Sequence, residues 1–442
     1  MTVTAALMAS VAATATLIRP AAVRLRLGFG NFLLCIGASV ILAACGAGGA
    51  DGVAPSTAAA SATAGGSVPG SVAPDPSQQA GAVTIVGLGK LIFRDQSLSA
   101  SGRLACASCH DPDNAHAPSN DLAAQLGGPD LAIQGSRAAP SLRYLNLTPG
   151  FALAADGTPS GGFNRDGRAA TLAAQAQRPF LAAHEMANPD AAAVVAKVRS
   201  APYVEQFRTL FGAAIFDDPA TAFERMLLAL QQYQQADPEF RPFNSKYDQF
   251  IAGRVSLDPA ELRGLALFNN PTKGNCAACH TSARAADGSP PLFTDFSFDN
   301  LGVPRNAALA ANRDPDYFDL GLCGPDRTDQ AARRELCGAF KVPTLRNVAT
   351  RKAFFHNGRF NKLEDVLGFY VRRDTNPEEW YPTGADGTVQ KFDDLPPALR
   401  GNVNVSEVPY NRQPNQAPAL SATEIADVIR FLGTLTDGYR AP

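Results

Sequence analysis

Apolar residues at helical spacing, rather than the alternation typical of strands, characterise the chain after about residue 82. Near the C-terminus, Ser421 and Glu424 form a capping box, and an apolar stripe at helical spacing follows them: Ile425, Val428, Ile429 and Leu432. Another helix is predicted to begin at Asp258, which is followed by a proline and by Glu261. Because alternating apolar runs are scarce, we predict a mainly α-helical protein with long proline-rich loops.

The first 45 residues have the pattern of an export signal. Three arginines precede an uncharged apolar run, residues 32–44, which is too short to span a bilayer comfortably. This run ends at Cys45 in the sequence Leu-Ala-Ala-Cys, which resembles the lipobox of bacterial lipoproteins. A plain secretory signal or a short membrane anchor is the alternative. We expect export to the periplasm, with a lipid on Cys45 as the only attachment to a membrane.

Residues 46–81 contain mostly Ala, Gly, Ser and Pro and almost no large apolar side chain. Such a segment buries too little surface to offset the entropy of ordering, so we predict a flexible linker. The 442-residue length allows two or three domains of about 150 residues. We predict two after the linker, 82–252 and 253–442, with the boundary between Phe240 and Asp258.

The charges of the chain are nearly balanced. Lysine and arginine together number 39, against 41 aspartates and glutamates. No strong field is therefore available to attract a polyanion, and nucleic acid is excluded as an expected partner.

Two C-x-x-C-H motifs carry the strongest chemical signal. Cys106, Cys109 and His110 form the first, and Cys276, Cys279 and His280 form the second. Two thiols three positions apart can bond both vinyl groups of one haem, while the adjacent histidine reaches the iron. A zinc site is disfavoured because zinc ribbons place their cysteine pairs about 15 to 20 residues apart, and a redox pair or a simple disulfide does not require the following histidine. We predict two cytochrome c-like domains, each with one covalently bound haem c.

The duplication extends upstream of the motifs. Residues 89–93 (GKLIF) precede the first copy much as residues 264–268 (GLALF) precede the second. Each segment is predicted to be a helix that leads into a haem-binding turn.

Further motifs make the chain resemble the bacterial di-haem cytochrome c peroxidase and MauG family over nearly everything after the linker. They are residues 88–93, 137–142 (RAAPSL), 166–168 (DGR), 300–306 (NLGVPRN), 340–347 (FKVPTLRN) and 355–358 (FHNG). The resemblance implies a peroxide-binding haem in the first domain and an electron-transfer haem in the second. It implies an oxidoreductase that reduces hydrogen peroxide with electrons from a small cytochrome c or cupredoxin.

Two other functions stay open. A MauG-like member would use peroxide to oxidise a protein partner, and a pure electron carrier would have both irons closed by two protein ligands. The sequence also leaves open whether the chain forms a homodimer.

The resemblance assigns two residues to the peroxide site. Glu185 is the expected acid-base group, because a carboxyl can move a proton from one peroxide oxygen to the other. Gln175 is its expected polar companion. Without the resemblance, both would be interpreted as solvated helix residues.

The second iron needs a ligand other than methionine. The four methionines are Met1, Met8, Met186 and Met226, so none follows the second motif. Tyr370 lies at helical spacing from Leu363, Val366 and Leu367, at a position where the family has methionine or, in MauG-like members, tyrosine. Tyr370 is therefore the expected ligand, with a core tyrosine as the alternative, and His356 is a further candidate.

Two positions depart from the family pattern. The tryptophan expected between the haems is Arg165, and the asparagine expected as a side-chain ligand of an interdomain calcium is Ala138. The second change argues against calcium unless backbone oxygens and water suffice.

The remaining histidines and cysteines are assigned by position. His116 is interpreted as a sixth ligand of the first haem or as a surface residue, and His184 as a residue that tunes the peroxide pocket or faces solvent. Cys323 and Cys337 are expected to form a disulfide that closes a charged loop.

Overall fold

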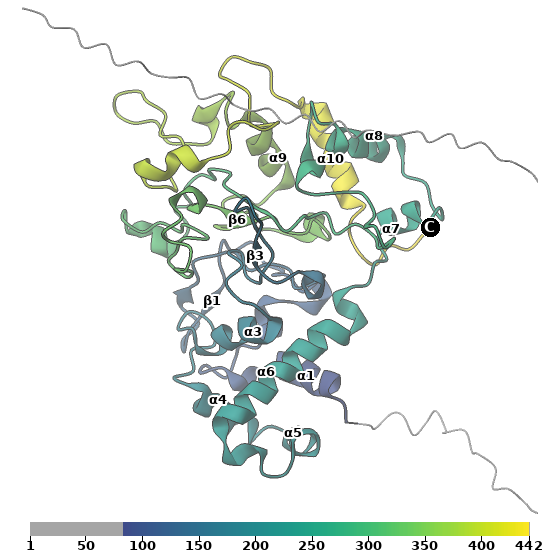
Figure 1. The fold of residues 1–442 in the computed structure, drawn as a ribbon, viewed down its shortest axis with the longest axis vertical. Coiled ribbons are helices and arrows are strands. Elements are labelled where there is room, and N and C mark those ends of the chain that lie inside the picture. The colour runs from purple at the N-terminus through teal and green to yellow at the C-terminus, as the bar shows by residue number, and fades with distance from the viewer. Residues whose placement is uncertain (1–82, 442) are drawn as a thin grey trace, which may run out of the picture. The chain divides into compact units, whose positions relative to one another are not determined.

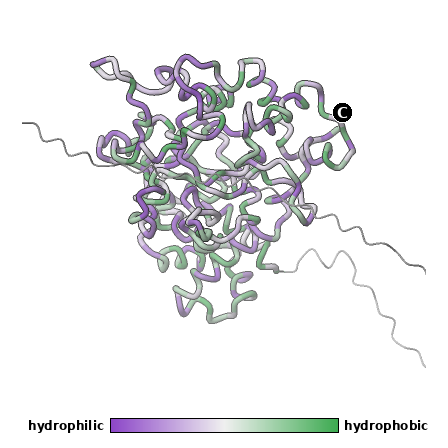
Figure 2. The backbone as a smooth tube through the Cα atoms, turned by 45° about the horizontal axis from the view of Figure 1, so that its top comes forward, coloured by the Kyte–Doolittle hydropathy of each residue, from purple (hydrophilic) through white to green (hydrophobic). Residues whose placement is uncertain are grey.

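The computed structural model describes residues 83–441. The predicted signal, the lipidation site Cys45 and the linker lie outside these residues. Among the described residues, no helix is both long enough and apolar enough to cross a bilayer. Hydrophobic and hydrophilic stretches instead alternate along the described chain (Figure 2).

Helices are the main regular secondary structure of the described residues, as predicted, and account for 37% of them. The first group comprises α1 (Ile85–Arg94), α2 (Cys106–Cys109), α3 (Leu172–Leu181), α4 (Ala191–Val198), α5 (Val204–Phe211) and α6 (Pro219–Ala236). The second comprises α7 (Lys246–Ile251), α8 (Pro259–Asn269), α9 (Leu363–Arg372) and α10 (Ala422–Gly433). Both helix starts predicted from capping boxes are confirmed, since Asp258 caps α8 and Ser421 caps α10.

The strands form three short antiparallel hairpins or pairs. They are β1 (Leu126–Gly127) with β2 (Ile133–Gln134), β3 (Ala152–Leu153) with β4 (Pro159–Ser160), and β5 (Phe298–Asp299) with β6 (Phe340–Lys341). The pairing of β5 with β6 joins segments far apart in the sequence. Lys341, on β6, lines the same cavity as the second C-x-x-C-H motif.

Two helix crossings of the same design organise the structure. In the first, α1 packs on α6, and in the second, α8 packs on α10 (Figure 1). A Cβ atom at Gly89 would lie 2.1 Å from the carbonyl oxygen of Ala229, and one at Gly264 would lie 2.0 Å from that of Asp427. Only glycine therefore permits either crossing at this separation. The repeat of residues 89–93 and 264–268 thus has a structural reason.

Each crossing belongs to its own apolar core. The N-terminal core draws buried residues from Leu88 to Phe240, and the C-terminal core draws them from Tyr247 to Leu435. Phe93 and Phe268, the last residues of the two repeated segments, are both buried, and they contact Tyr233 of α6 and Phe431 of α10 respectively. Each C-x-x-C-H motif follows the first helix of its crossing, so the cores position the two motifs.

Candidate haem sites

The first motif presents a histidine whose protonation is fixed by the backbone. Cys106 and Cys109 lie on the single turn of α2, and His110 ends it. The Nδ1 atom of His110 is 3.0 Å from the carbonyl oxygen of Pro140 and 3.3 Å from that of His116. A carbonyl only accepts, so Nδ1 carries the proton and Nε2 keeps a free lone pair, as an iron ligand requires. Burial lowers the pKa of His110 to about 4, which keeps the ring neutral.

The second motif repeats this arrangement. Cys276 lies on a short 3₁₀ turn, Cys276–Ala278, and His280 follows it. The Nδ1 atom of His280 is 2.8 Å from the carbonyl oxygen of Phe293. Burial is the main cause that lowers the pKa of His280. Both histidines are therefore neutral donors with a free Nε2.

The four motif cysteines are unpaired thiols. Burial raises the pKa of Cys106, Cys276 and Cys279 to about 12 and that of Cys109 to about 11. Within residues 83–441, no group of three or more His, Cys, Asp or Glu side chains gathers where it could hold a metal ion. The described structure therefore gives the zinc alternative no support, whereas thiols free to form thioethers fit haem.

A second repeat supports the two histidines and was missed in the sequence. Residues 140–143 (PSLR) and 343–346 (PTLR) each precede a residue in the left-handed conformation, Tyr144 with φ 65° and Asn347 with φ 60°. The Ser141 hydroxyl donates to Ala115 O, and the Thr344 hydroxyl donates to Leu292 O. A comparison of the two halves of the sequence would have revealed this repeat, because the two tetrapeptides differ at a single position.

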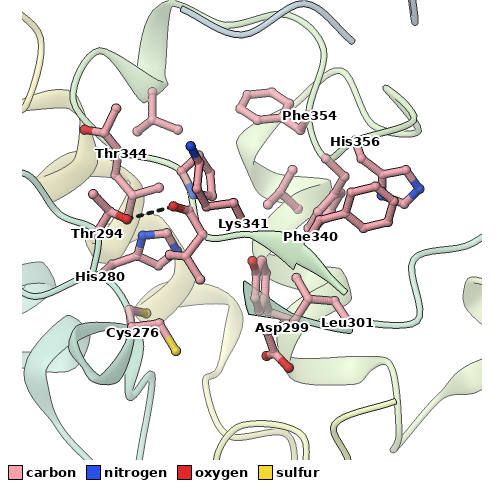
Figure 3. A pocket seen from close by; sticks show the side chains of 18 of the residues that line it. Cys276, His280, Thr294, Asp299, Leu301, Phe340, Lys341, Thr344, Phe354 and His356 are labelled. Atoms are coloured by element: carbon pink, nitrogen blue, oxygen red, sulfur yellow. Dashed lines mark hydrogen bonds between the residues drawn. The ribbon is translucent and has the colours of Figure 1, made fainter. Parts of the chain in front are cut away.

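A cavity of about 280 Å³ adjoins the second motif. Cys276, Cys279 and His280 line one side of it, and Tyr370 and His356 also contribute to its wall. Figure 3 shows His280 and Cys276 on one side of this space, with Phe340 and His356 on the other. The structure thus gathers the sequence-predicted residues of the second haem at one cavity, and the motif thiols, the neutral histidine and the apolar wall fit a haem group.

Tyr370 lies on α9 and shares the buried face of Val366 and Leu367, as its spacing predicts. Among the described residues, no hydrogen bond engages its hydroxyl group, which argues against a hydroxyl satisfied within the core. Burial raises the pKa of Tyr370. A second tyrosine, Tyr410, also lines the cavity, and its pKa is raised chiefly by burial. Tyr410 was missed because it lies in an irregular loop without any periodic pattern.

His356 has surroundings different from those of the two motif histidines. Its ring stacks on Phe340 with 3.8 Å between centroids and 7° between planes. Its Nε2 atom is 3.4 Å from Asp394 Oδ2 and makes no hydrogen bond. This nitrogen therefore faces a carboxylate, and a role of His356 as an iron ligand stays a prediction.

Glu185 lies beside the first motif. Its charge raises the pKa of Cys109, second to burial, which shows that the carboxyl is within electrostatic range of the motif. The side chain as a whole is 41% exposed, yet Oε2 is shielded from solvent and has no hydrogen-bond partner in the described part of the chain. Burial raises the pKa of Glu185, and nearby His184, Arg178 and Arg168 oppose that rise.

A glycine hairpin fixes the backbone of Glu185. Gly128 N donates to Glu185 O over 2.9 Å. A Cβ atom at Gly127, on β1, would lie 2.3 Å from His184 O and 2.6 Å from Glu185 O. The β1–β2 hairpin therefore packs against the backbone of residues 184 and 185 and fixes its position.

Gln175 lies half-buried on α3, whose N-cap is Thr171, and its side chain makes no hydrogen bond to another described residue. From the same helix, Arg178 donates to Asp326 Oδ1 over 2.6 Å. Asp326 belongs to the loop closed by the disulfide between Cys323 and Cys337. This loop therefore supports the helix that carries Gln175.

The structure contradicts one of the two sequence interpretations of His116. His116 is fully buried, so it is not a surface residue. Its carbonyl accepts from His110 Nδ1, and its ring packs on Phe240 at 4.2 Å between centroids. The Nε2 atom of His116 is 3.7 Å from Glu239 Oε1, and a role of His116 as a sixth ligand of the first haem stays a prediction. His184 is partly exposed, with its Nε2 atom 4.0 Å from Glu185 Oε1.

Comparisons with known proteins agree with this geometry. Residues 84–256 match the family model for di-haem cytochrome c peroxidase. The chain is 35% identical over 371 residues to methylamine utilization protein MauG of Paracoccus denitrificans. The alignment covers 81% of this chain and 90% of that protein. The chain belongs to the di-haem cytochrome c peroxidase and MauG family. Members of this family are oxidoreductases, and the family implies two haem c groups with iron.

Both branches of the di-haem cytochrome c peroxidase and MauG family are represented among the relatives. Cytochrome c551 peroxidase of Nitrosomonas europaea is 28% identical over 302 residues, which cover 66% of this chain and 74% of that protein. The crystal structure of the di-haem peroxidase BthA from Burkholderia thailandensis superposes with a TM-score of 0.73 at 41% identity, and covers 83% of this chain and 87% of that one. The fold is therefore that of a di-haem peroxidase.

Proposed function

We propose that the chain reduces hydrogen peroxide to water at the haem of His110, with two electrons and two protons for each peroxide. The observation that carries this proposal is the shielded, unpartnered Oε2 atom of Glu185 beside the first motif. Haem iron supplies the open coordination position for peroxide when it is bound there. A carboxyl oxygen without another partner is free to accept a proton from one peroxide oxygen and to donate it to the other.

The surroundings of Glu185 suit this exchange. Burial favours its protonated form, while Arg178 and Arg168 favour its ionised form. These opposing effects bring the two forms closer in free energy than for a carboxyl that only burial affects. The β1–β2 hairpin holds the carboxyl in place, and Gln175 is proposed as the second polar group of this pocket.

The haem of His280 is proposed as the entry point for electrons from a small cytochrome c or cupredoxin. Tyr370 is proposed as the second protein ligand there, because it lines the same cavity as His280. An oxygen donor favours ferric over ferrous iron and lowers the reduction potential relative to methionine. The donor would then need a low potential itself.

A MauG-like oxidase, which uses peroxide to oxidise a protein partner, is the second candidate. The same tyrosine favours it, because an oxygen donor stabilises the more oxidised states of haem iron, which could hold the oxidising equivalents of peroxide until they pass to a partner. We further propose export and a lipid anchor at Cys45, from the N-terminal pattern alone.

Three measurements test these functions. Stoichiometric peroxide is mixed with the ferric protein while the haem bands are followed, and a high-spin haem that responds supports peroxide chemistry. Two low-spin haems that ignore peroxide would indicate an electron carrier. Steady turnover with a reduced small cytochrome or cupredoxin supports the peroxidase, whereas a peroxide response without such turnover supports the oxidase. Mass spectrometry of the exported protein should show the mass of two haems and of a lipid.

A further inference from the structure

Three cationic side chains converge where the N-terminal and C-terminal cores meet. Arg165 Nε donates to Ala138 O over 2.9 Å, and Arg351 Nη2 donates to Ala139 O over 3.0 Å. Lys341 N donates to Arg165 O over 2.8 Å, and the Lys341 ammonium donates to Gly162 O. All three side chains line the cavity beside the second motif.

None of these cations has a carboxylate partner among residues 83–441. Arg165, Lys341 and Arg351 take part in no ion pair there, whereas the neighbouring Arg137 and Arg168 do. The nearby carboxylates Asp166 and Asp319 are already bound by Arg137, at 2.7 and 2.6 Å respectively. Two carboxylates on the cavity wall, Asp299 and Glu407, bind Asn404 instead.

The energetic consequence is visible in the ionisation of the cluster. Burial lowers the pKa of Lys341 to about 8, that of Arg165 to about 9 and that of Arg351 to about 10. Asp166 opposes the lowering of the Lys341 pKa, to which Arg165 adds, and Asp319 opposes that of the Arg165 pKa, to which Arg351 adds, but Arg137 binds both carboxylates. Buried like charges without a counter-charge destabilise a fold, so the cluster requires an anion.

The same place does not fit the calcium that the family resemblance implies. Ala138 has no ligand atom in its side chain, and the guanidinium of Arg165 already occupies its carbonyl oxygen. No acidic cluster that could hold an ion occurs among the described residues. Three positive charges would also repel a divalent cation.

We propose that Arg165, Lys341 and Arg351 bind the propionate carboxylates of haem at this edge of the cavity, and that they replace the interdomain calcium. This inference rests on haem loading, which the family implies, and not on the peroxidase reaction. The carboxylates neutralise the cluster, and the cluster connects the two cores by charge in place of a metal.

The metal is tested on the haem-loaded full chain. After dialysis, elemental analysis should find no stoichiometric calcium, and a calcium chelator should leave the haem spectra unchanged. One tightly held calcium per chain, with spectra that change on chelation, would overturn the proposal.

The carboxylate contact is tested by the reduction potential of the second haem in Lys341→Met, with Lys341→Arg and Lys352→Met as controls. Lys352 is exposed and makes no ion pair among the described residues. Removal of a cation beside the haem should disfavour the ferrous form and shift the reduction equilibrium about tenfold, or about 59 mV for one electron. The two controls should keep the wild-type potential. Haem content measured in parallel excludes a folding defect.

Two outcomes separate the source of the anion from the function. The first outcome concerns the difference in reduction potential between Lys341→Met and the wild type. If added phosphate abolishes this difference, a free anion rather than propionate occupies the cluster, and the propionate proposal is wrong. If the potential shifts as expected but no variant or wild-type protein reacts with peroxide, the cluster stands and the proposed function fails.

Discussion

The ring of Tyr410 lies 5.9 Å from that of Tyr370, centroid to centroid, with 32° between their planes. Both rings line the cavity of the second motif, and neither hydroxyl has a hydrogen-bond partner among the described residues. Tyr144 lines the same cavity, but its hydroxyl donates to Asp437 Oδ1 over 2.7 Å, so Tyr370 on α9 and Tyr410 are the two candidates. Substitution of each in turn distinguishes an iron ligand from a neighbour.

Tyr370→Met should raise the reduction potential of the second haem, because a thioether favours ferrous iron more than a phenolate oxygen does. We expect a change of at least about tenfold in the reduction equilibrium, or about 59 mV, by spectroelectrochemical titration. Tyr410→Met is the matched control and should leave the spectrum of the ferric haem unchanged. A larger shift in the control would move the ligand assignment to Tyr410.

Glu185→Gln should lower kcat/KM for peroxide by about 10²–10⁴-fold, since the amide cannot shuttle a proton. The change is measured by stopped-flow mixing of peroxide with the protein. Glu205→Gln, on the exposed face of α5, is the control and should react as the wild type does. A loss of less than tenfold in Glu185→Gln would remove this residue from the reaction.

The pH dependence of that reaction follows from the raised pKa of Glu185, whose main cause is burial. A raised pKa keeps the carboxyl protonated to a higher pH than an ordinary glutamate. The peroxide reaction needs the ionised form as base, so the rate should fall on acidification with a midpoint above the usual glutamate value of about 4.3. This acidic limb should vanish in Glu185→Gln, and a limb that persists there would belong to another group.

The sequence predicted those features that depend on short spacing. The C-x-x-C-H motifs, the caps at Asp258 and Ser421 and the buried face of Tyr370 each involve residues within a few positions of one another. The mainly α-helical class followed from the same local patterns.

The features that the sequence did not predict depend on long-range contacts. The carbonyl of Pro140 reaches His110 from 30 positions away, and Ala115 and His116, both left-handed, precede a carbonyl, that of His116, that lies 3.3 Å from His110 Nδ1. Within the described part of the chain, Arg165 lacks a counter-ion because Arg137 binds both nearby carboxylates, Asp166 and Asp319. No periodicity encodes such partners.

The disulfide between Cys323 and Cys337 predicts a stability effect. The double variant Cys323→Ser with Cys337→Ser should lose about 3 kcal/mol in the chain-entropy model, because the bond closes a loop of about 15 residues. Denaturant unfolding measures the loss. Addition of a reductant to the wild type should give the same value, and it should leave the double variant unaffected.

The glycine crossings give the last prediction. Gly264→Ala should lower the free energy of unfolding by about 1–3 kcal/mol, because a Cβ 2.0 Å from Asp427 O forces α8 away from α10. Gly433→Ala, in α10 itself, is the control, since its Cβ would meet nothing within 4 Å. The control should be neutral or stabilising by about 0.4–1 kcal/mol. Gly89→Ala should resemble Gly264→Ala, because the crossing of α1 with α6 has the same design; equal stability of all three variants would show that the helices separate without cost.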